Sequence, residues 1–181
     1  SDSILVIGDN REGETEESRK NATKANMEAF VEFYNVSVSD FGEIKVYDSF
    51  LCNESTSLGV DKLYIEVDEF VLEGQENPYG EYTEFHGIAV GELHIKGKAA
   101  FDESVTVDKL YLAKGTATFG RLYAEYATTC DLIVNEETIV NAGSTVFING
   151  SAKIADLTIS DDNTDCLEIY LGGTWEQGLE E

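Results

Sequence analysis

Proline, basic residues and catalytic motifs are all scarce in this sequence. Its 181 residues include one proline, Pro78, whereas an average usage of about 5% would give roughly nine. Proline cannot donate a hydrogen bond to a β ladder, so its scarcity favours a chain that consists mostly of paired strands. No stretch approaches the roughly 18 consecutive apolar residues that a membrane-spanning helix needs.

Basic residues are far outnumbered by acidic ones. The chain holds 12 Lys and Arg against 36 Asp and Glu, which gives a formal net charge of -24. A surface of this charge repels phosphate groups, so nucleic acid and anionic membranes are excluded as partners. Because 42% of the residues are hydrophobic, the chain is able to bury a core, and we expect one folded domain with an appendage.

The motifs of common enzyme classes are missing. The sequence contains no G-x-S-x-G, P-loop or G-x-G-x-x-G word. Its histidines, His86 and His94, form no H-x-H or H-E-x-x-H pattern, which argues against a catalytic metal. In a chain with 36 acids, carboxylate pairs at glycosidase spacing arise by chance and indicate nothing. We therefore expect a protein that is not an enzyme.

Short strands and turns make up the sequence from residue 36 onward. Apolar and other residues alternate in words such as Leu110-Tyr111-Leu112 and Leu157-Thr158-Ile159, and Gly, Asn or Asp separates most of these words. Strands that are so short and so closely spaced must stack, which predicts an all-β fold: a β-solenoid or a pile of β-arches. The alternative is an antiparallel β-sandwich or jelly roll.

An internal repeat relates residues 42–74 to residues 91–121. The word Gly-Glu-Ile-Lys-Val at 42–46 matches Gly-Glu-Leu-His-Ile at 91–95. The word Val-Asp-Lys-Leu-Tyr-Ile at 60–65 matches Val-Asp-Lys-Leu-Tyr-Leu at 107–112. Two words that recur in the same order indicate a repeat architecture. We therefore divide the chain into residues 1–35, an N-terminal strand, polar arm and helix, and a β-rich domain over 36–181.

The N-terminal region combines an apolar strand with a polar arm. Ile4, Leu5, Val6 and Ile7 form the strand, and a charged segment follows it. A strand on such an arm is able to pair with another subunit, although it could equally pack within its own chain. Residues 15–34 are predicted to form the one helix, because four apolar residues are spaced as on one helical face, namely Met27, Phe30, Val31 and Tyr34.

Four N-x-S/T sequons point to the cell exterior. They begin at Asn21, Asn35, Asn53 and Asn149. N-linked glycans at these sites would make the chain a secreted or surface glycoprotein. The alternative is that Asn and Ser simply gather in turns. Taken with the acid surplus, the sequons favour an extracellular or cell-surface location.

Cysteine usage leaves two interpretations. The chain holds three cysteines, Cys52, Cys130 and Cys166, and no C-x-x-C word. In a secreted protein this odd number implies one disulfide and a spare thiol, or disulfides between chains. In a cytosolic protein the same cysteines would be small buried residues.

A calcium loop is one interpretation of the acidic segment near the C-terminus. Asp161, Asn163 and Asp165 supply oxygen ligands at alternate positions, as the first part of a calcium-binding loop does. Cys166 replaces the glycine of an EF-hand, so only a looser calcium loop fits, and the alternative is an acidic turn. Trp175 either packs on the end of the β stack or stacks on carbohydrate.

Residues 90–171 resemble the passenger segments of secreted β-helical surface proteins and adhesins, and the subunits of prokaryotic extracellular sheaths and fibres. The resemblance rests on the rhythm of Gly and Asn turns between strands rich in Val, Ile and Leu.

These features together predict an extracellular structural protein. It would self-assemble into a filament, sheath or surface layer through strand pairing between subunits, reinforced by disulfides, glycans and calcium. The alternative is an adhesin or carbohydrate-binding module that stacks sugars on rows of tyrosines, namely Tyr64, Tyr111, Tyr123 and Tyr126. A polysaccharide-active β-helix enzyme ranks third.

Overall fold

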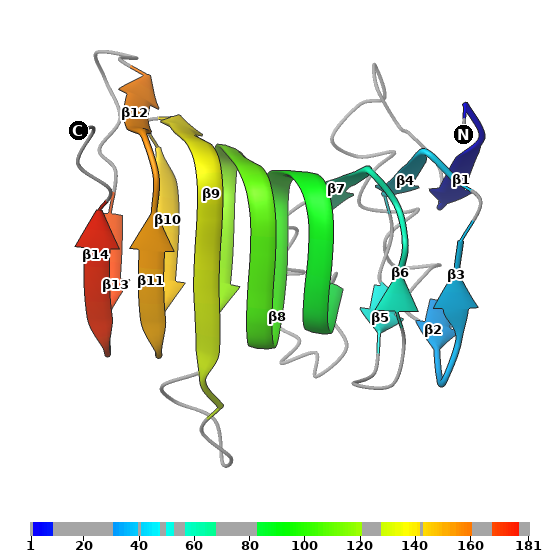
Figure 1. The fold of residues 1–181 in the computed structure, drawn as a ribbon, viewed down its shortest axis with the longest axis horizontal. Coiled ribbons are helices and arrows are strands. Elements are labelled where there is room, and N and C mark those ends of the chain that lie inside the picture. Colours follow the sequence, from blue (N-terminus) through cyan, green and yellow to red (C-terminus); the bar gives the residue numbers. More distant parts are fainter. Residues whose placement is uncertain are drawn as a thin grey trace, which may run out of the picture.

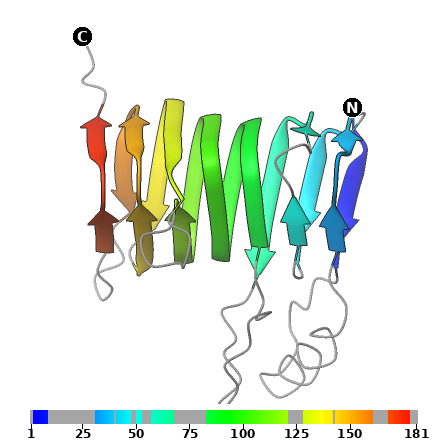
Figure 2. The ribbon, with the colours of Figure 1, turned by 90° about the horizontal axis from the view of Figure 1, so that it is seen from below.

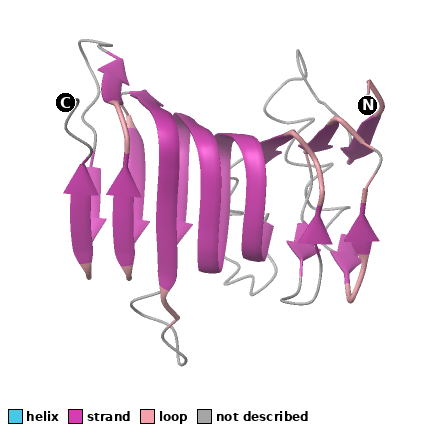
Figure 3. Ribbon diagram, in the orientation of Figure 1, coloured by secondary structure: helices cyan, strands magenta, loops and turns pink. Residues whose placement is uncertain are grey.

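The computed structural model describes residues 2–8, 31–39, 41–47, 50–52, 57–67, 83–120, 128–141, 143–160 and 168–177. This part of the chain contains fourteen strands and no helix (Figure 3). The strands are β1 (Ile4–Ile7), β2 (Val31–Phe33), β3 (Ser37–Val38), β4 (Glu43–Val46), β5 (Phe50–Cys52), β6 (Ser57–Leu58), β7 (Lys62–Val67), β8 (Thr83–Phe119), β9 (Cys130–Asn141), β10 (Ser144–Ile148), β11 (Ser151–Ile154), β12 (Leu157–Ser160), β13 (Glu168–Leu171) and β14 (Thr174–Gln177). Since the described residues include no helix, none that could cross a membrane is found among them.

The strands wind around a common axis and form three faces. Face 1 consists of β1, β4, β7, residues 92–97 and 109–112 of β8, residues 137–141 of β9, and β12. Face 2 consists of β2, β5, residues 83–85, 98–101 and 115–119 of β8, β10 and β13. Face 3 consists of β3, β6, residues 87–90 and 103–107 of β8, residues 130–134 of β9, β11 and β14.

The long strand β8 shows most clearly that the chain coils. It runs through 37 residues, and in Figure 1 it winds through successive turns as one continuous ribbon. His94 stacks on Tyr111 with ring centroids 4.4 Å apart, so residues 92–97 and 109–112 lie in neighbouring turns. Counting the segments of face 1 in the described residues gives seven turns, which lie side by side in Figure 2.

Every strand pairing among the described residues is parallel. The prediction of an all-β solenoid is therefore confirmed, and the alternative of an antiparallel sandwich or jelly roll is wrong. A parallel pair cannot be closed by a tight hairpin, so each strand meets its partner only after the chain has passed over the other two faces.

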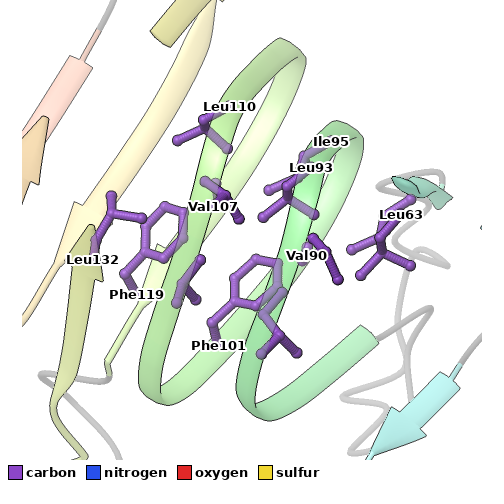
Figure 4. Packing of buried hydrophobic residues seen from close by; sticks show 14 of the residues in the cluster. Leu63, Val90, Leu93, Ile95, Phe101, Val107, Leu110, Phe119 and Leu132 are labelled. Atoms are coloured by element: carbon purple, nitrogen blue, oxygen red, sulfur yellow. The ribbon is translucent and has the colours of Figure 1, made fainter. Parts of the chain in front are cut away.

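Alternate residues of each strand fill the interior. Ile44, Leu63 and Leu93 occupy equivalent positions of successive turns and are all fully buried. We term such a series of equivalent residues a column. Figure 4 shows how residues of these columns pack against one another across the turns. Burial of each large apolar side chain contributes about 1.5–3 kcal/mol, and the core continues from Ile7 to Ile154.

The internal repeat of the sequence corresponds to two turns of the solenoid. Residues 43–46 pair with 62–65, which in turn pair with 92–95. The matching words at 42–46 and 91–95 therefore lie on face 1 with one turn between them. The words at 60–65 and 107–112 are likewise separated by the turn that holds residues 92–97.

Two expectations for the N-terminal region change. Of the predicted helix 15–34, only residues 31–34 are described, and Val31–Phe33 form strand β2 paired with β5, so the helix is wrong over these residues. Val31 and Phe33 suit a pleated sheet, and the partner strand overrides their helical spacing. Strand β1 pairs with β4 of its own chain, so one of its two edges is occupied within the molecule.

Candidate functional site

The two ends of the solenoid leave strand edges open. The order of strands in the sheet begins at β1, which pairs only with β4 among the described residues. At the opposite end, β12, β13 and β14 pair on one side only within the described part of the chain. Figure 1 shows the two termini at opposite ends of the stack. An edge of this kind is a template for another strand.

Exposed apolar side chains gather at the same two ends. In the first turn they are Ile4, Val6, Val31, Tyr34 and Val36, and in the last turn Ile159 and Leu171. Among the described residues, one further exposed large hydrophobic side chain, Ile133, lies between the ends. Exposed apolar surface gathered in this way marks an interaction site.

The last turn exposes two positions that are core positions in the preceding turn. Val140 is 4% exposed, whereas Ile159, the next residue of the same column, is 52% exposed. On face 2, Ile148 is 0% exposed and Leu171, which follows it in the column, is 46% exposed. Within the described part of the chain, the interior of the solenoid is therefore exposed at Ile159 and Leu171, at its C-terminal end.

Trp175 lies in β14 beside Ala152 of the preceding turn. Its side chain is partly buried and packs against the core. It also lines a small apolar cavity of about 20 Å³. Of the two interpretations of this tryptophan, packing on the end of the stack fits this position.

Face 1 carries a column in which acids and bases alternate. The register places Glu43 beside Lys62 and Lys62 beside Glu92, and it places Lys109 beside Glu137. Since His94 stacks on Tyr111, Glu92 and Lys109 are also neighbours. We term these five residues the charge ladder. Lys62 Nζ lies 3.6 Å from Glu92 Oε2 within it.

A second column of face 1 is aromatic. His94 stacks between Tyr64, with ring centroids 4.3 Å apart, and Tyr111, with centroids 4.4 Å apart. Lys45 Nζ lies 5.5 Å from the centroid of the Tyr64 ring. The faces of these rings are thus turned toward neighbouring turns, and mainly their edges face outward. Such rings cannot serve as a flat platform for sugars, and Tyr123 and Tyr126 lie outside the described residues.

Hydrogen bonds tie the two columns together. His94 Nε2 lies 3.1 Å from Glu92 Oε2, and this hydrogen bond lowers the pKa of Glu92, with the charge of Lys62 as a further cause. Tyr111 donates to Glu137 at 3.0 Å. Burial of Tyr111, followed by this hydrogen bond, raises the pKa of its phenol. Lys96 donates to Glu66 at 2.8 Å beside the two columns.

The charges of face 1 cancel. The strand segments of this face hold four acids and four bases, namely Glu43, Glu66, Glu92, Glu137, Lys45, Lys62, Lys96 and Lys109. The corresponding segments of face 3 hold three acids and one base, namely Glu103, Asp131, Glu176 and Lys153. One face of a molecule with a net charge of -24 is therefore neutral.

A shallow hollow lies between face 3 and face 1. It has a volume of about 310 Å³, and its polar lining includes Asp61, Asp108 and Asn135. Asn135 Nδ2 donates to Asp108 Oδ1 at 3.1 Å. Gly91 lies in the turn between the two aspartates and has no side chain to fill the space.

Cys52 and Cys130 are both buried free thiols. Burial raises the pKa of each thiol to about 12. Neither forms a disulfide in this structure, and both match the interpretation as small buried residues. Because these two thiols are buried, Cys166 is the remaining cysteine for a disulfide between chains, and it lies outside the described residues.

The structure describes two of the four sequon asparagines and none of the three residues of the proposed calcium loop. Asn35 is exposed and has a left-handed backbone conformation, with φ 55°. Asn149 is half-buried, and its Nδ2, the atom that would carry a glycan, donates to the carbonyl of Thr128 at 2.7 Å. The residues outside the described part are Asn21, Asn53, Asp161, Asn163 and Asp165. Among the described residues no group of three or more acids, histidines and cysteines could hold a metal ion.

The open ends and the neutral face depend on contacts between residues far apart in the sequence. The repeated word Val-Asp-Lys-Leu-Tyr carries the signal for the charge ladder, because it brings Lys62 and Lys109 to the same column on either side of Glu92. The neutral face was nevertheless not foreseen from the sequence.

Comparison with protein-family models, with curated proteins and with solved structures found no match to this chain.

Proposed function

We propose that the protein is an extracellular structural protein that assembles end to end into a filament through β-strand pairing between subunits. The observation that carries this proposal is the open last turn. Ile159 lies in a column whose other members are buried, and Leu171 follows the fully buried Ile148 in its column; a further turn would bury both in the same way.

The first turn of another copy fits this role. Continuing the columns across the junction places β12 of one copy beside β1 of the next, with Leu157 opposite Leu5 and Ile159 opposite Ile7. All four of these residues are apolar. On face 2 the same continuation brings Leu171 next to Phe33. The N-terminal strand predicted to join subunits would then do so with the edge that β4 leaves free.

Joining two different ends produces an open assembly. A head-to-tail interface of this kind is heterologous, and without a closing rotation it generates a filament. Seven turns at about 4.8 Å each give a subunit repeat of about 34 Å along the axis. A sheath or surface layer would require additional lateral contacts between such filaments.

The charge of -24 acts against assembly. Subunits that join end to end concentrate acids, so salt or divalent cations should strengthen the association by screening the repulsion. Calcium would act in this way whether or not residues 161–165 form a loop that binds it. The acid surplus and the exposed sequon at Asn35 support the extracellular location.

The alternative function, a carbohydrate-binding module, loses its main support. It relied on exposed rows of tyrosines, and the ring faces of Tyr64 and Tyr111 are directed at His94 between them. Glycan binding by a monomer would nevertheless favour this alternative over assembly.

The test compares one substitution at two places. Ile159→Lys puts a charge into the open last turn, whereas Ile133→Lys places the same charge on an exposed isoleucine in the middle of the stack. Negative-stain electron microscopy and light scattering follow assembly over a series of salt and calcium concentrations. We expect filaments with a repeat of about 34 Å from the unmodified protein and from Ile133→Lys, and monomers from Ile159→Lys.

Two results would overturn the proposal. One is an unmodified protein that stays monomeric at high concentration with millimolar calcium. The other is an Ile159→Lys variant that assembles as well as the Ile133→Lys control. Stronger assembly at low salt than at high salt would contradict the role given to the charge.

A further inference from the structure

Face 1 combines three properties that none of the other described surfaces shares. It is neutral, it is a continuous parallel sheet, and it carries aromatic side chains among its charges. Interfaces between proteins are enriched in aromatic residues, and complementary charges across an interface fix its register and disfavour wrong partners. Face 3 keeps an excess of acids among its described side chains and would repel an acidic partner.

The four central charges of face 1, those of Lys62, Glu92, Lys109 and Glu137, are arranged so that they complement one another between two copies. Along the charge ladder the order is Glu43, Lys62, Glu92, Lys109, Glu137. A two-fold axis that runs along the strand direction, midway between Glu92 and Lys109, reverses this order in a second copy. Glu92 then faces Lys109 of the second copy, and Lys62 faces its Glu137. Every acid of this central stretch therefore meets a base.

The aromatic column obeys the same symmetry. With the axis in that position, His94 faces Tyr111 of the second copy, and Tyr64 faces its Ile139. The exposed ring edges, which sugars cannot stack on, would meet other ring edges and an aliphatic side chain. Burying these apolar ring edges removes apolar surface from water, which favours the contact.

We propose that face 1 docks onto face 1 of a second copy, with the two solenoids antiparallel. Charge decides between the possible occupants, because an acidic partner gains nothing from a neutral face and nucleic acid is repelled by the rest of the molecule. A second copy carries the same -24, and face 1 is the surface on which two copies approach with the least repulsion. The pairing is isologous and closes at two copies.

The contact of one pair is small. Seven turns of about 4.8 Å and strands of about four residues give a footprint of roughly 400 Å², below the roughly 800 Å² per partner of a typical stable interface. Single chains should therefore pair weakly. This pairing does not depend on the end-to-end assembly proposed above, but it would become stronger when many copies in two filaments engage together.

The experiment separates lateral pairing from end-to-end assembly by using the Ile159→Lys background. Sedimentation velocity over a concentration series measures the monomer–dimer equilibrium of this protein. Lys62→Glu with Lys109→Glu makes the whole charge ladder acidic. The control, Lys98→Glu with Lys153→Glu, makes the same change of charge at two exposed lysines outside face 1. We expect the ladder variant to dimerise at least tenfold more weakly than the control.

A mixture of two variants distinguishes lost pairing from lost folding. The second variant carries Glu92→Lys and Glu137→Lys. When two copies of this variant pair, lysine faces lysine, because position 92 lies opposite Lys109 and position 137 lies opposite Lys62. Each variant alone should be monomeric. Their equimolar mixture should form a heterodimer, because each opposed pair at positions 62, 92, 109 and 137 is again an acid and a base. Circular dichroism checks that both are folded.

Three results would overturn the inference. They are a monomeric parent protein at millimolar concentration, equal weakening in the ladder variant and the control, and a mixture of two folded variants that remains monomeric. A partner of another chemistry on face 1 would give the first of these results. A dimer that survives in the ladder variant must use a different surface.

Discussion

Phe101 and Phe119 occupy equivalent positions in successive turns of the solenoid, and their rings stack with centroids 5.2 Å apart and planes within 12° of parallel. Both are fully buried. They lie on face 2, where smaller residues such as Ala99 and Ala117 fill the neighbouring column. Among the described residues these two rings are the largest fully buried side chains (Figure 4), so the stability of the fold should be sensitive to their replacement.

Replacing Phe119 with alanine should cost about 3–5 kcal/mol of the free energy of unfolding, because it removes a large buried side chain and leaves a cavity beside Phe101. Phe119→Leu keeps most of the apolar volume and should cost less than about 1.5 kcal/mol. Urea titration followed by circular dichroism measures both. Equal losses in the two variants would show that the ring is not packed as described.

Gly115→Ala should destabilise the protein on the order of 3 kcal/mol through overpacking and backbone strain. Gly115 has φ +150° and lies against Gly97 of the preceding turn, where an added Cβ would overlap the carbonyl oxygen of Gly97. The control is Gly59→Ala, whose added Cβ would lie 3.3 Å from the carbonyl oxygen of Val38 and requires only a small shift. Thermal unfolding compares them, and a lower melting temperature for Gly59→Ala would contradict the prediction.

Glu92 should make stability depend on pH in the acid range. Its pKa in the folded protein is lowered, chiefly by the hydrogen bond with His94, so its carboxylate stabilises the fold above its ordinary pKa of 4.5. This contribution is lost as the pH falls through the lowered folded value. The stability difference between the unmodified protein and Glu92→Gln should therefore shrink between pH 7 and pH 3.

Melting temperatures across this range test the prediction for Glu92. The control for losing one acid is Glu136→Gln, an exposed residue that is not part of the charge ladder. A difference for Glu92→Gln that stays constant down to pH 3 would show that the contact with His94 does not stabilise the carboxylate.

The thiols of Cys52 and Cys130 should be inert in the folded protein. With a pKa of about 12, only about one thiol in ten thousand is ionised at pH 8, and the thiolate is the reactive form. Alkylation with iodoacetamide followed by peptide mass spectrometry should label neither residue until urea unfolds the chain. Rapid labelling of either residue under native conditions would contradict their burial.

Much of the architecture could be predicted because strand period and repeat are local signals. The alternation in Leu110-Tyr111-Leu112 requires one buried and one outward side of a strand, and the structure places Leu110 and Leu112 inside and Tyr111 on the surface. Sequence words that recur after two turns indicate stacking, since equivalent positions must fill the same column.

The segment at 31–33 shows why other parts could not be predicted. Val31 and Tyr34 share a helical spacing with residues before them, and nothing nearby in the sequence contradicts a helix. The strand identity of Val31–Phe33 depends on Phe50–Cys52, which pairs with it from the next turn. A short segment of this kind takes its structure from a distant partner and not from its own periodicity.

The neutral face escaped prediction for a similar reason. Lys62 and Glu92 are thirty positions apart in the sequence, and only the register of β7 with β8 brings them together. The composition shows only that the molecule is acidic. It does not show that the lysines of four different segments lie on one face together with an equal number of acids. The open last turn could not be foreseen either, because Ile159 resembles any other residue of the core until its column is known.

The unequal length of the strands determines where the molecule would yield to force. Hydrogen bonds between turns run along the axis of the solenoid, so tension along this axis is borne by the boundaries between turns. At the boundary between the first two turns, β1 pairs four residues with β4, β2 three with β5 and β3 two with β6. At a central boundary, residues 109–112 pair with four residues of β9, 115–119 with five of β10, and β9 with three of β11. A stretched molecule would therefore open at its N-terminal turns while the central turns remain intact.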